Sequence, residues 1–475
     1  MFGLHPERVA TICIRELPPR SPKGTPWPFG SGGSLRFWES DHRPIHGFFQ
    51  GISSWVDPLP SGQMTTFLVS DRVIDTRARQ VVAGQAVMVE GDRIQAVIPR
   101  SEVPKGATVI SLPNQTLLPG LIDCHTHLIG PVDNGHGYAH LVARSAAQDV
   151  LEGVRHAAEM LHAGFTTVRD VGAFRAFADV ALREAIEAGW VKGPRMQCAG
   201  AYVTCPGGAG DITGLAVDTA QIVTRDLRFG VVSGADQTRV AVRQILGRGA
   251  DLIKVIATGA PQTLGTSPAV PELTEDEIKA AVEVAVEHGV HVAAHAHGAE
   301  AIKRAVRAGA RSIEHGSLLD DQAIELMKKT GTYLVADLYN ADWIATEGPA
   351  LGYAAEVIEK NALVVEAQRK SFAKCVAAGV KIAFGSDCGM FPHRYAGRQF
   401  ARYVENGLTP MQAILSATIW AAELIGWEDR VGSIEPGFYA DLIAVEGDPT
   451  SDVDRLENIS FVMKNGLVER TVGIQ

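Results

Sequence analysis

The chain has 475 residues, of which 46% are hydrophobic and 21% are charged. This composition is ordinary for a globular protein with a sizeable core, and it excludes a mostly disordered or fibrous chain. The net charge is −10, and no block of lysine or arginine provides the basic stripe that nucleic-acid binding requires. No apolar run is long enough for a membrane-spanning helix. We therefore expect neither nucleic acids nor membranes among its partners.

The six cysteines form no CxxC pair. Their scarcity argues against a disulfide scaffold and against a cysteine-ligated zinc site. We therefore expect a reducing, cytoplasmic location. The fifteen histidines remain as the main resource for chemistry.

Residues 1–63 differ from the rest of the chain. They are rich in proline, glycine and serine, show no sustained strand or helix period, and lack the pattern of a secretory signal. Met64 then opens a clear strand pattern, MTTFLVSDRVID. Our hypothesis is that 1–63 is an irregular N-terminal extension, either upstream of a physiological start at Met64 or a loosely held appendage.

Short apolar runs alternate with turn residues over 64–118, which predicts a small antiparallel sheet. A matching set of runs returns over 432–475, where Asn465 and Gly466 form a hairpin turn. Two strand sets that flank a different middle section predict one composite β-sandwich domain built from both ends of the chain.

The middle section, 119–431, repeats one unit, in which a helical stretch ends in glycine and is followed by a short apolar strand that ends in a polar residue. Examples are AGFTTVRD (163–170), HGVHVAAH (288–295) and AGARSIEH (308–315). Helix–glycine–strand units repeated in this way indicate parallel strands with helical crossovers. Counting eight such strands predicts an α/β fold, a (β/α)8 barrel of the TIM type, whose active site lies at the C-terminal ends of the strands.

The first predicted barrel strand carries His125 and His127, which lie on the same face because residues two apart on a strand do so. Lys254 lies in the otherwise apolar strand LIKVI. One interpretation is a lysine whose amine reaches the barrel rim. The other is a desolvated lysine that loses its proton and is carboxylated by CO2, which gives an oxygen ligand able to bridge two metals.

Three more polar residues close later strands, namely His295, His315 and Asp387. Taken alone, each has a structural interpretation, as a core histidine or, for Asp387, as a helix N-cap. Four imidazoles, a lysine and a carboxylate at the strand ends of one barrel are not explained by any structural need. A divalent metal centre explains them, because imidazole nitrogen and carboxylate oxygen suit zinc, manganese, cobalt or nickel.

In this order, the motifs resemble those of the amidohydrolase superfamily, over essentially all of 64–475. Within it they look like the branch of imidazolonepropionase-like and Xaa-Pro-dipeptidase-like enzymes, which includes carboxypeptidases, ochratoxin-type amide hydrolases, and carbamate or phenylurea hydrolases. The matching stretches are PGLIDCHTHL (119–128), GFTTVRDVG (164–172), GADLIKV (249–255), HVAAHAHG (291–298), SIEHG (312–316), AFGSD (383–387) and GSIEPGFYADLIAV (432–445).

The resemblance implies two divalent metal ions, with zinc as the first expectation and cobalt or manganese as alternatives. His125 and His127 would bind the buried metal, and Asp387 would complete its ligands. His295 and His315 would bind the outer metal. Lys254, as its N-carboxylate, would bridge the two.

The activity implied is hydrolysis of an amide bond in a small peptide, an N-acyl amino acid or a related compound, by a metal-bridging hydroxide. Asp387 would take the proton of the water and pass it to the leaving nitrogen. His297 would contact the substrate or its oxyanion, or else support a neighbouring ligand. The alternatives are an imidazolonepropionase-like cyclic amide hydrolase and a urea or carbamate hydrolase. A non-catalytic scaffold is a further reading, which the intact ligand set opposes.

Two stretches depart from the family pattern. In GGAGD (207–211), Ala209 stands where relatives often have histidine, and the end of the seventh strand, VADLYN (335–340), brings in Asp337. Asp337 is either a local cap or ion-pair partner, or the cation-binding side for an amino group or a basic side chain. Tyr202, Arg169 and Tyr339 are expected contacts to a substrate carboxylate or carbonyl. Relatives commonly oligomerise, so we expect a homo-oligomer.

Overall fold

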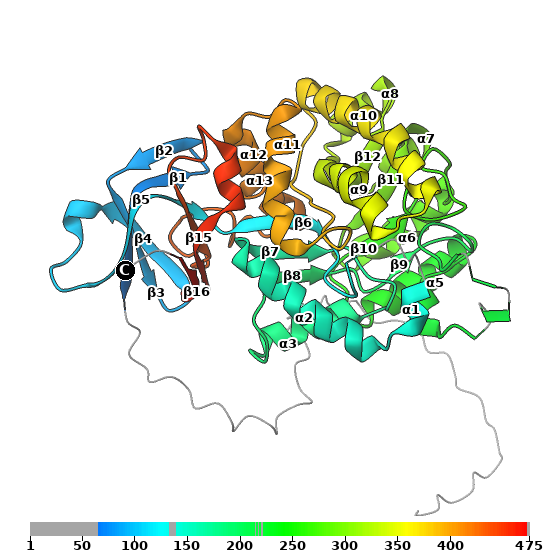
Figure 1. Ribbon diagram of the computed structural model, residues 1–475, viewed down its shortest axis with the longest axis horizontal. Coiled ribbons are helices and arrows are strands. Elements are labelled where there is room, and N and C mark those ends of the chain that lie inside the picture. The colour runs from blue at the N-terminus through cyan, green and yellow to red at the C-terminus, as the bar shows by residue number, and fades with distance from the viewer. Residues whose placement is uncertain (1–64, 133–138, 214, 217, 220–221, 473–475) are drawn as a thin grey trace, which may run out of the picture. The chain divides into compact units, whose positions relative to one another are not determined.

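The computed structural model describes residues 65–132, 139–213, 215–216, 218–219 and 222–472 (Figure 1). The predicted extension 1–63 and its boundary at Met64 lie outside the described residues. Figure 1 shows two parts in the described chain, a β-sheet built from both ends and a larger barrel ringed by helices. No helix of the described ranges has the length and apolarity needed to cross a membrane.

Strands from both ends of the chain form one eight-stranded sheet in the order β16-β15-β14-β5-β1-β3-β4, with β2 also paired to β1. This confirms the predicted composite β domain. Its strands are β1 (Thr66–Asp75), β2 (Gln80–Ala83), β3 (Gln85–Glu90), β4 (Arg93–Pro99), β5 (Thr108–Pro119), β14 (Leu442–Glu446), β15 (Ile459–Lys464) and β16 (Leu467–Thr471), and the short 3-10 helices η1 (Arg100–Glu102) and η4 (Val453–Glu457) lie between them.

The sheet is mixed, which corrects the prediction of a wholly antiparallel one. β1 and β5 pair in parallel, with Leu68 opposite Ile110. The reason is that β3 pairs along the other edge of β1 and β4 pairs with β3, so the chain crosses over before β5 returns in the same direction as β1. β14 then adds to β5 in antiparallel register, with Ile443 opposite Leu118, which joins the two ends of the chain.

The barrel strands run parallel, as the helix–glycine–strand repeat predicts. They form two hydrogen-bonded groups, β6-β7-β8 and β9-β10-β11-β12-β13. The groups meet where the Asp251 amide donates to the Cys198 carbonyl at 2.8 Å. Their bounds are β6 (Leu121–Thr126), β7 (Phe165–Asp170), β8 (Arg195–Cys198), β9 (Tyr202–Val203), β10 (Ile253–Ile256), β11 (Val292–Gly298), β12 (Ser312–Leu318) and β13 (Tyr333–Val335).

The eighth predicted strand, which ends at Asp387, closes the barrel but is not a regular strand. It makes isolated bridges to both neighbours, Ile382 to Leu334 and Cys388 to Thr126. Gly385 explains the close approach, because a Cβ there would lie 2.9 Å from the His125 Cβ. Gly389, with φ at 119°, passes the His127 side chain in the same way. The glycines around Asp387 therefore let this segment pass directly against β6.

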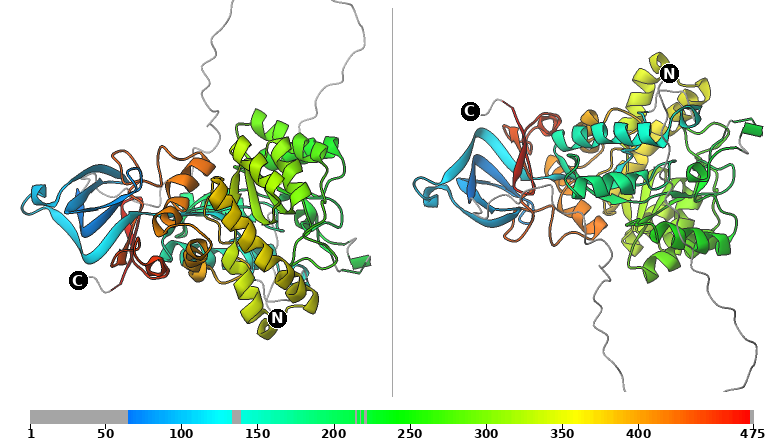
Figure 2. Two further views of the ribbon diagram at one scale, coloured as in Figure 1. Left: turned by 90° about the horizontal axis from the view of Figure 1, so that it is seen from above. Right: turned by 90° about the horizontal axis from the view of Figure 1, so that it is seen from below.

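Helices surround the barrel, as the two views in Figure 2 show. α6 begins with a capping box of Thr274 and Glu277, and α7 ends at Gly309 with φ at 100°, as expected for a helix that stops at glycine. The helices are α1 (Ala139–Ala143), α2 (Ala146–His162), α3 (Ala178–Glu187), α5 (Ala235–Leu246), α6 (Glu275–Glu287), α7 (Ala299–Ala308), α8 (Asp321–Thr330), α9 (Leu338–Leu351), α10 (Ala355–Ala378), α11 (Gln399–Glu405), α12 (Pro410–Ser416) and α13 (Ile419–Ile425), with 3-10 turns η2 (Arg225–Arg228) and η3 (His393–Arg398).

Candidate metal centre and substrate cavity

A cavity of about 210 Å³ lies at the C-terminal ends of the barrel strands. The six residues predicted as metal ligands all line it, so the structure brings them together as the strand pattern predicts. They are His125, His127, Lys254, His295, His315 and Asp387. Two further sets of donors in the described chain are close enough to hold an ion, and both share His315: one includes His295 and His297, the other Asp337 and Asp387.

Asp387 lies beside the histidine pair of β6. Its Oδ1 is 3.5 Å from the Nε2 of His125 and 3.3 Å from the Nε2 of His127. The φ of Asp387 is 59°, in the left-handed region that a non-glycine residue rarely adopts. Such strain persists only where the surroundings hold it, and it is common at functional sites. The backbone of this segment is therefore shaped to direct the carboxylate at the two imidazoles.

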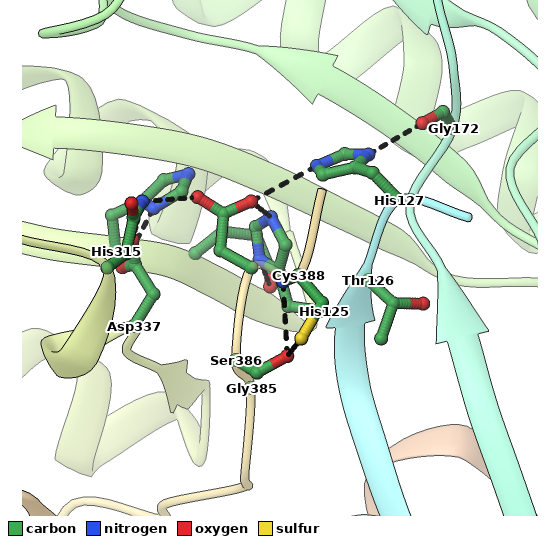
Figure 3. Close-up of polar contacts among 12 residues, drawn as sticks. His125, Thr126, His127, Gly172, His315, Asp337, Gly385, Ser386 and Cys388 are labelled. Carbon is green, nitrogen blue, oxygen red and sulfur yellow. Dashed lines mark hydrogen bonds and ion pairs between the residues drawn. The ribbon is translucent and has the colours of Figure 1, made fainter. Parts of the chain in front are cut away.

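The hydrogen bonds of these rings show which nitrogen is free. The Nδ1 of His127 donates to the Gly172 carbonyl at 2.7 Å, as Figure 3 shows. The Nδ1 of His125 is 2.8 Å from a Glu314 carboxylate oxygen. Because both partners accept hydrogen bonds, each Nδ1 carries a hydrogen, and in the neutral form of each ring the Nε2 then presents a lone pair to Asp387. Lone pairs that face a carboxylate at this range repel it unless a proton or a cation lies between them, so this donor set fits a metal ion.

The second group of donors comes from β11 and β12. His315 has its Nδ1 2.9 Å from Asp337 Oδ1, which leaves its Nε2 for a ligand (Figure 3). The ring centres of His295 and His315 are 4.5 Å apart, and the His297 ring stacks on that of His315 at 4.7 Å. A ligand atom from each of these three histidines lies within 4.8 Å of the other two.

His297 is not among the described residues that line the cavity. Its Nδ1 is 2.8 Å from the Ser317 hydroxyl, and its Nε2 is buried with no hydrogen-bond partner among the described residues. Of the two roles that the sequence left open, this position favours support of the donor cluster over contact with the substrate.

Burial sets the protonation of the histidines. It lowers the pKa of His125, His295 and His297 well below the usual value, and the charges of neighbouring residues lower it further. For His127, burial also lowers the pKa, but the hydrogen bond and charge of Asp387 outweigh it, and the net pKa is raised. Neutral imidazole is the form that binds a metal, so three of these histidines are held ready for that task.

Lys254 lies in β10 with its side chain fully inside the barrel. Its ammonium nitrogen is buried and has no hydrogen-bond partner among the described residues. Burial lowers its pKa to about 8, against the opposing charge of Glu314. Its positive charge lowers the pKa of His125 in one donor group and that of His295 in the other. A buried amine without a partner is costly, which marks this atom as incomplete without a further group.

Asn340, in the first turn of α9, ties the two donor groups together. Its side-chain amide donates to Asp387 Oδ2 at 2.8 Å and to Asp337 Oδ2 at 3.1 Å. Asn340 is 2% exposed, so water does not compete for these bonds. Gln368 of α10 completes the support by donating to Asp337 Oδ1 at 3.0 Å. The orientation of both carboxylates is therefore fixed from the helical side of the barrel.

Arg169, predicted as a substrate contact, is not among the residues that line the described cavity. Its guanidinium donates to the Cys124 carbonyl at 2.6 Å, to the Ser312 hydroxyl at 3.1 Å and to Glu314 at 2.9 Å. It is 3% exposed. Arg169 therefore neutralises Glu314, which in turn orients the His125 ring.

Of the other predicted substrate contacts, one lines the cavity and two do not. Tyr202 lines the cavity, and its hydroxyl donates to the Gly172 carbonyl at 2.9 Å. Tyr339 is buried outside the described lining, where its hydroxyl accepts from Arg398 at 2.8 Å. Asp337 is occupied by His315, Asn340 and Gln368. Tyr339 and Asp337 thus lie outside the described lining, their role as substrate contacts stays a prediction, and Asp337 orients the His315 ring.

The residues that sequence reasoning missed are mainly the supports of the donors. Glu314 and Asn340 contact predicted ligands directly. Ala209 does line the cavity, as expected for the position where relatives often have histidine. Asp211 in the same loop pairs with Arg228 through two bonds of 2.6 and 2.7 Å, so its role is structural.

Known proteins share this fold and much of the sequence. Ochratoxinase from Aspergillus niger is 30% identical over 410 residues, which cover 82% of this chain and 84% of the relative. A Xaa-Pro dipeptidase crystallised with methionine in its active site is 36% identical, with a TM-score of 0.79 and coverage of 85% and 99% of the two chains. A prolidase complexed with N-methylphosphonate-L-proline is 31% identical, with a TM-score of 0.79 and coverage of 87% and 100%.

The amidohydrolase family model matches residues 116–472, which include the whole barrel and the strands β14 to β16 of the composite sheet. The match covers well over half of the chain and contains every donor described above. The chain therefore belongs to the amidohydrolase family, as a hydrolase with the histidine- and aspartate-rich donor groups of a metal-dependent enzyme at its barrel mouth.

Proposed function

We propose that the protein is a binuclear metal-dependent hydrolase that cleaves the amide bond of a small peptide or N-acyl amino acid. One observation carries this proposal: donors of two groups line the same cavity, and the Lys254 amine, which has no hydrogen-bond partner among the described residues, lowers the pKa of a histidine in each group. His125, His127 and Asp387 form the first group, and the second contains His295 and His315.

The donor set suits two zinc ions, with cobalt or manganese as alternatives, since it consists of imidazole nitrogens and carboxylate oxygens. When bound, such ions supply Lewis acidity toward a carbonyl oxygen and lower the pKa of a water molecule toward neutrality. The Nδ1 hydrogen bonds of His125, His127 and His315 support this assignment, because each fixes a ring with Nε2 toward the centre.

Lys254 is proposed to act as its N-carboxylate. A pKa of about 8 leaves a useful fraction of the amine neutral near neutral pH. The neutral amine attacks the carbon of CO2, one carbon–oxygen π bond opens as the carbon–nitrogen bond forms, and the N–H proton is released to water. The product carries two oxygens and a negative charge, which suit a position between the two donor groups better than a buried ammonium does.

Asp387 is proposed as the proton carrier. Its Oδ2 accepts from Asn340, so Oδ1 is the atom left to take a proton from the attacking water. The leaving nitrogen then needs this proton to depart as an amine. Tyr202, which lines the cavity next to His127, is proposed as a substrate contact.

The named relatives support the choice of an amide substrate. An Xaa-Pro dipeptidase, a prolidase and an ochratoxinase are each named for a small substrate or its class. The test is a panel of dipeptides and N-acyl amino acids, with imidazolonepropionate and arylureas included for the alternative activities. We expect the zinc-loaded protein to cleave members of the amide panel, and the Lys254→Ala variant to lose this activity together with bound metal. Turnover of imidazolonepropionate or arylureas alone would refute the proposal.

A further inference from the structure

We infer that the cavity selects a substrate with an apolar group beside the scissile bond and rejects one with a basic side chain. This inference rests on the proposed function and names its substrate class. The inference is drawn from the cavity-lining residues that are not donors, several of which follow a donor closely in sequence.

Beyond the donors, the described lining of the cavity is mostly apolar. Ile129 follows His127 by two residues, Ile256 follows Lys254 by two, and Met390 follows Asp387 by three. Phe174 and Leu141 also line the cavity, and the Phe174 ring packs edge-on against Tyr202 at 5.2 Å. A substrate whose amide bond lies at the donors must therefore place a flanking group against this wall.

The charged side chains of the wall are already neutralised. Outside the donor cluster, Asp149 and Arg175 are the charged residues of the described lining. The Nε of Arg175 donates to Asp149 at 2.6 Å, and its other nitrogens bond Asp226 and the Leu141 carbonyl. Arg144 donates to the second oxygen of Asp149 at 2.8 Å. Each carboxylate oxygen of Asp149 therefore already accepts from an arginine, and these two cations offset its single negative charge.

Asp337, which the sequence suggested as a binding partner for a basic substrate group, is also engaged in hydrogen bonds within the protein. It accepts from His315, Asn340 and Gln368, and it lies outside the described lining. A lysyl or arginyl group in this cavity would thus lose its water without gaining an anion. An aliphatic or aromatic group of similar length loses only unfavourable contact with water.

The direct test compares matched substrates on the zinc-loaded protein. One series varies the acyl side, with Leu-Pro, Phe-Pro and Lys-Pro, and a second varies the leaving side, with N-acetyl-leucine, N-acetyl-phenylalanine and N-acetyl-lysine. We expect kcat/KM for the apolar members to exceed that for the lysine member by about 100-fold in at least one series. Equal values within both active series would overturn the inference, whereas no turnover of any amide would contradict the proposed function instead.

A charge placed in the wall should change this preference. Phe174→Glu supplies a carboxylate in the lining, and we expect the ratio of lysine to leucine turnover to rise by about 10-fold or more. Met390→Glu provides the same test on another strand end if the first variant does not fold. Leu363→Glu is the matched control, because Leu363 is 77% exposed on α10 and outside the described lining. Its ratio should equal that of the wild type, and an unchanged ratio in both wall variants would contradict the inference.

Discussion

Asn340→Leu tests whether Asn340 acts by orienting the donor carboxylates or only by filling space in the core. The change keeps the size of the side chain but removes the amide that donates to Asp387 and Asp337. A hydrogen bond to a charged group contributes about 1.5–3 kcal/mol. Loss of the bond to Asp387 alone therefore lowers kcat/KM by about 10- to 150-fold, since about 1.4 kcal/mol is a factor of ten in rate. We expect the loss mainly in kcat, because Asn340 fixes the proton carrier and does not line the described cavity.

The control for this experiment is Asn361→Leu. Asn361 is also buried, at 3% exposure, but its amide donates to the backbone carbonyl of Ala341 at 2.9 Å. Both variants should lose thermal stability, and only Asn340→Leu should lose activity and bound metal. The assay is steady-state kinetics with metal content and melting temperature measured on the same samples. Equal kcat values in the two variants would refute a positioning role for Asn340.

Two further predictions concern acid stability and the cavity loop. His156 and His393 are buried and stacked with ring centres 4.1 Å apart, and burial lowers the pKa of both. The unfolded chain therefore binds more protons below pH 6.5, so stability is lost as the pH falls, by up to about 1.4 kcal/mol per histidine for each pH unit. His156→Phe should melt with a shallower dependence on pH between 7 and 5.5 than the wild type, and parallel curves would contradict this origin. Lys360 of α10 donates to the Thr263 and Thr266 carbonyls at 2.7 and 3.1 Å, and Thr263 lines the cavity. Lys360→Met should raise KM by about 10-fold through a loosened loop, with kcat nearly unchanged, whereas a fall in kcat at constant KM would show that this loop is not a binding element.

The strand pattern predicted the barrel and the donors because both follow from short-range rules. His125 and His127 share a face of β6 by simple alternation, and four helix–glycine–strand units end in a polar residue that lines the cavity, namely Lys254, His295, His315 and Asp387. The parallel pairing of β1 with β5 was not predictable in this way, because it depends on which edge of β1 the strands β3 and β4 occupy.

Alternation fails at Glu314 and His315, which are adjacent in sequence. The φ of His315 is 70°, which breaks the regular strand geometry. As a result, Glu314 contacts His125 inside the barrel while His315 reaches the second donor group. Asn340 was missed for another reason, since it lies in a helix after the seventh strand and nothing local marks its partners. The contact of Arg169 with Glu314 was not predictable from its strand either, because it depends on how deep the side chain lies in the barrel.

Metal content measured by mass spectrometry on the purified protein tests the central claim most directly. We predict two divalent ions per wild-type chain, their removal by a chelator, and their return when zinc and bicarbonate are added together. Lys254→Met should fail to regain the full content under the same conditions, while Lys360→Met should regain it. A wild-type chain that binds no divalent ion, with Lys254 as a free amine, would contradict the account.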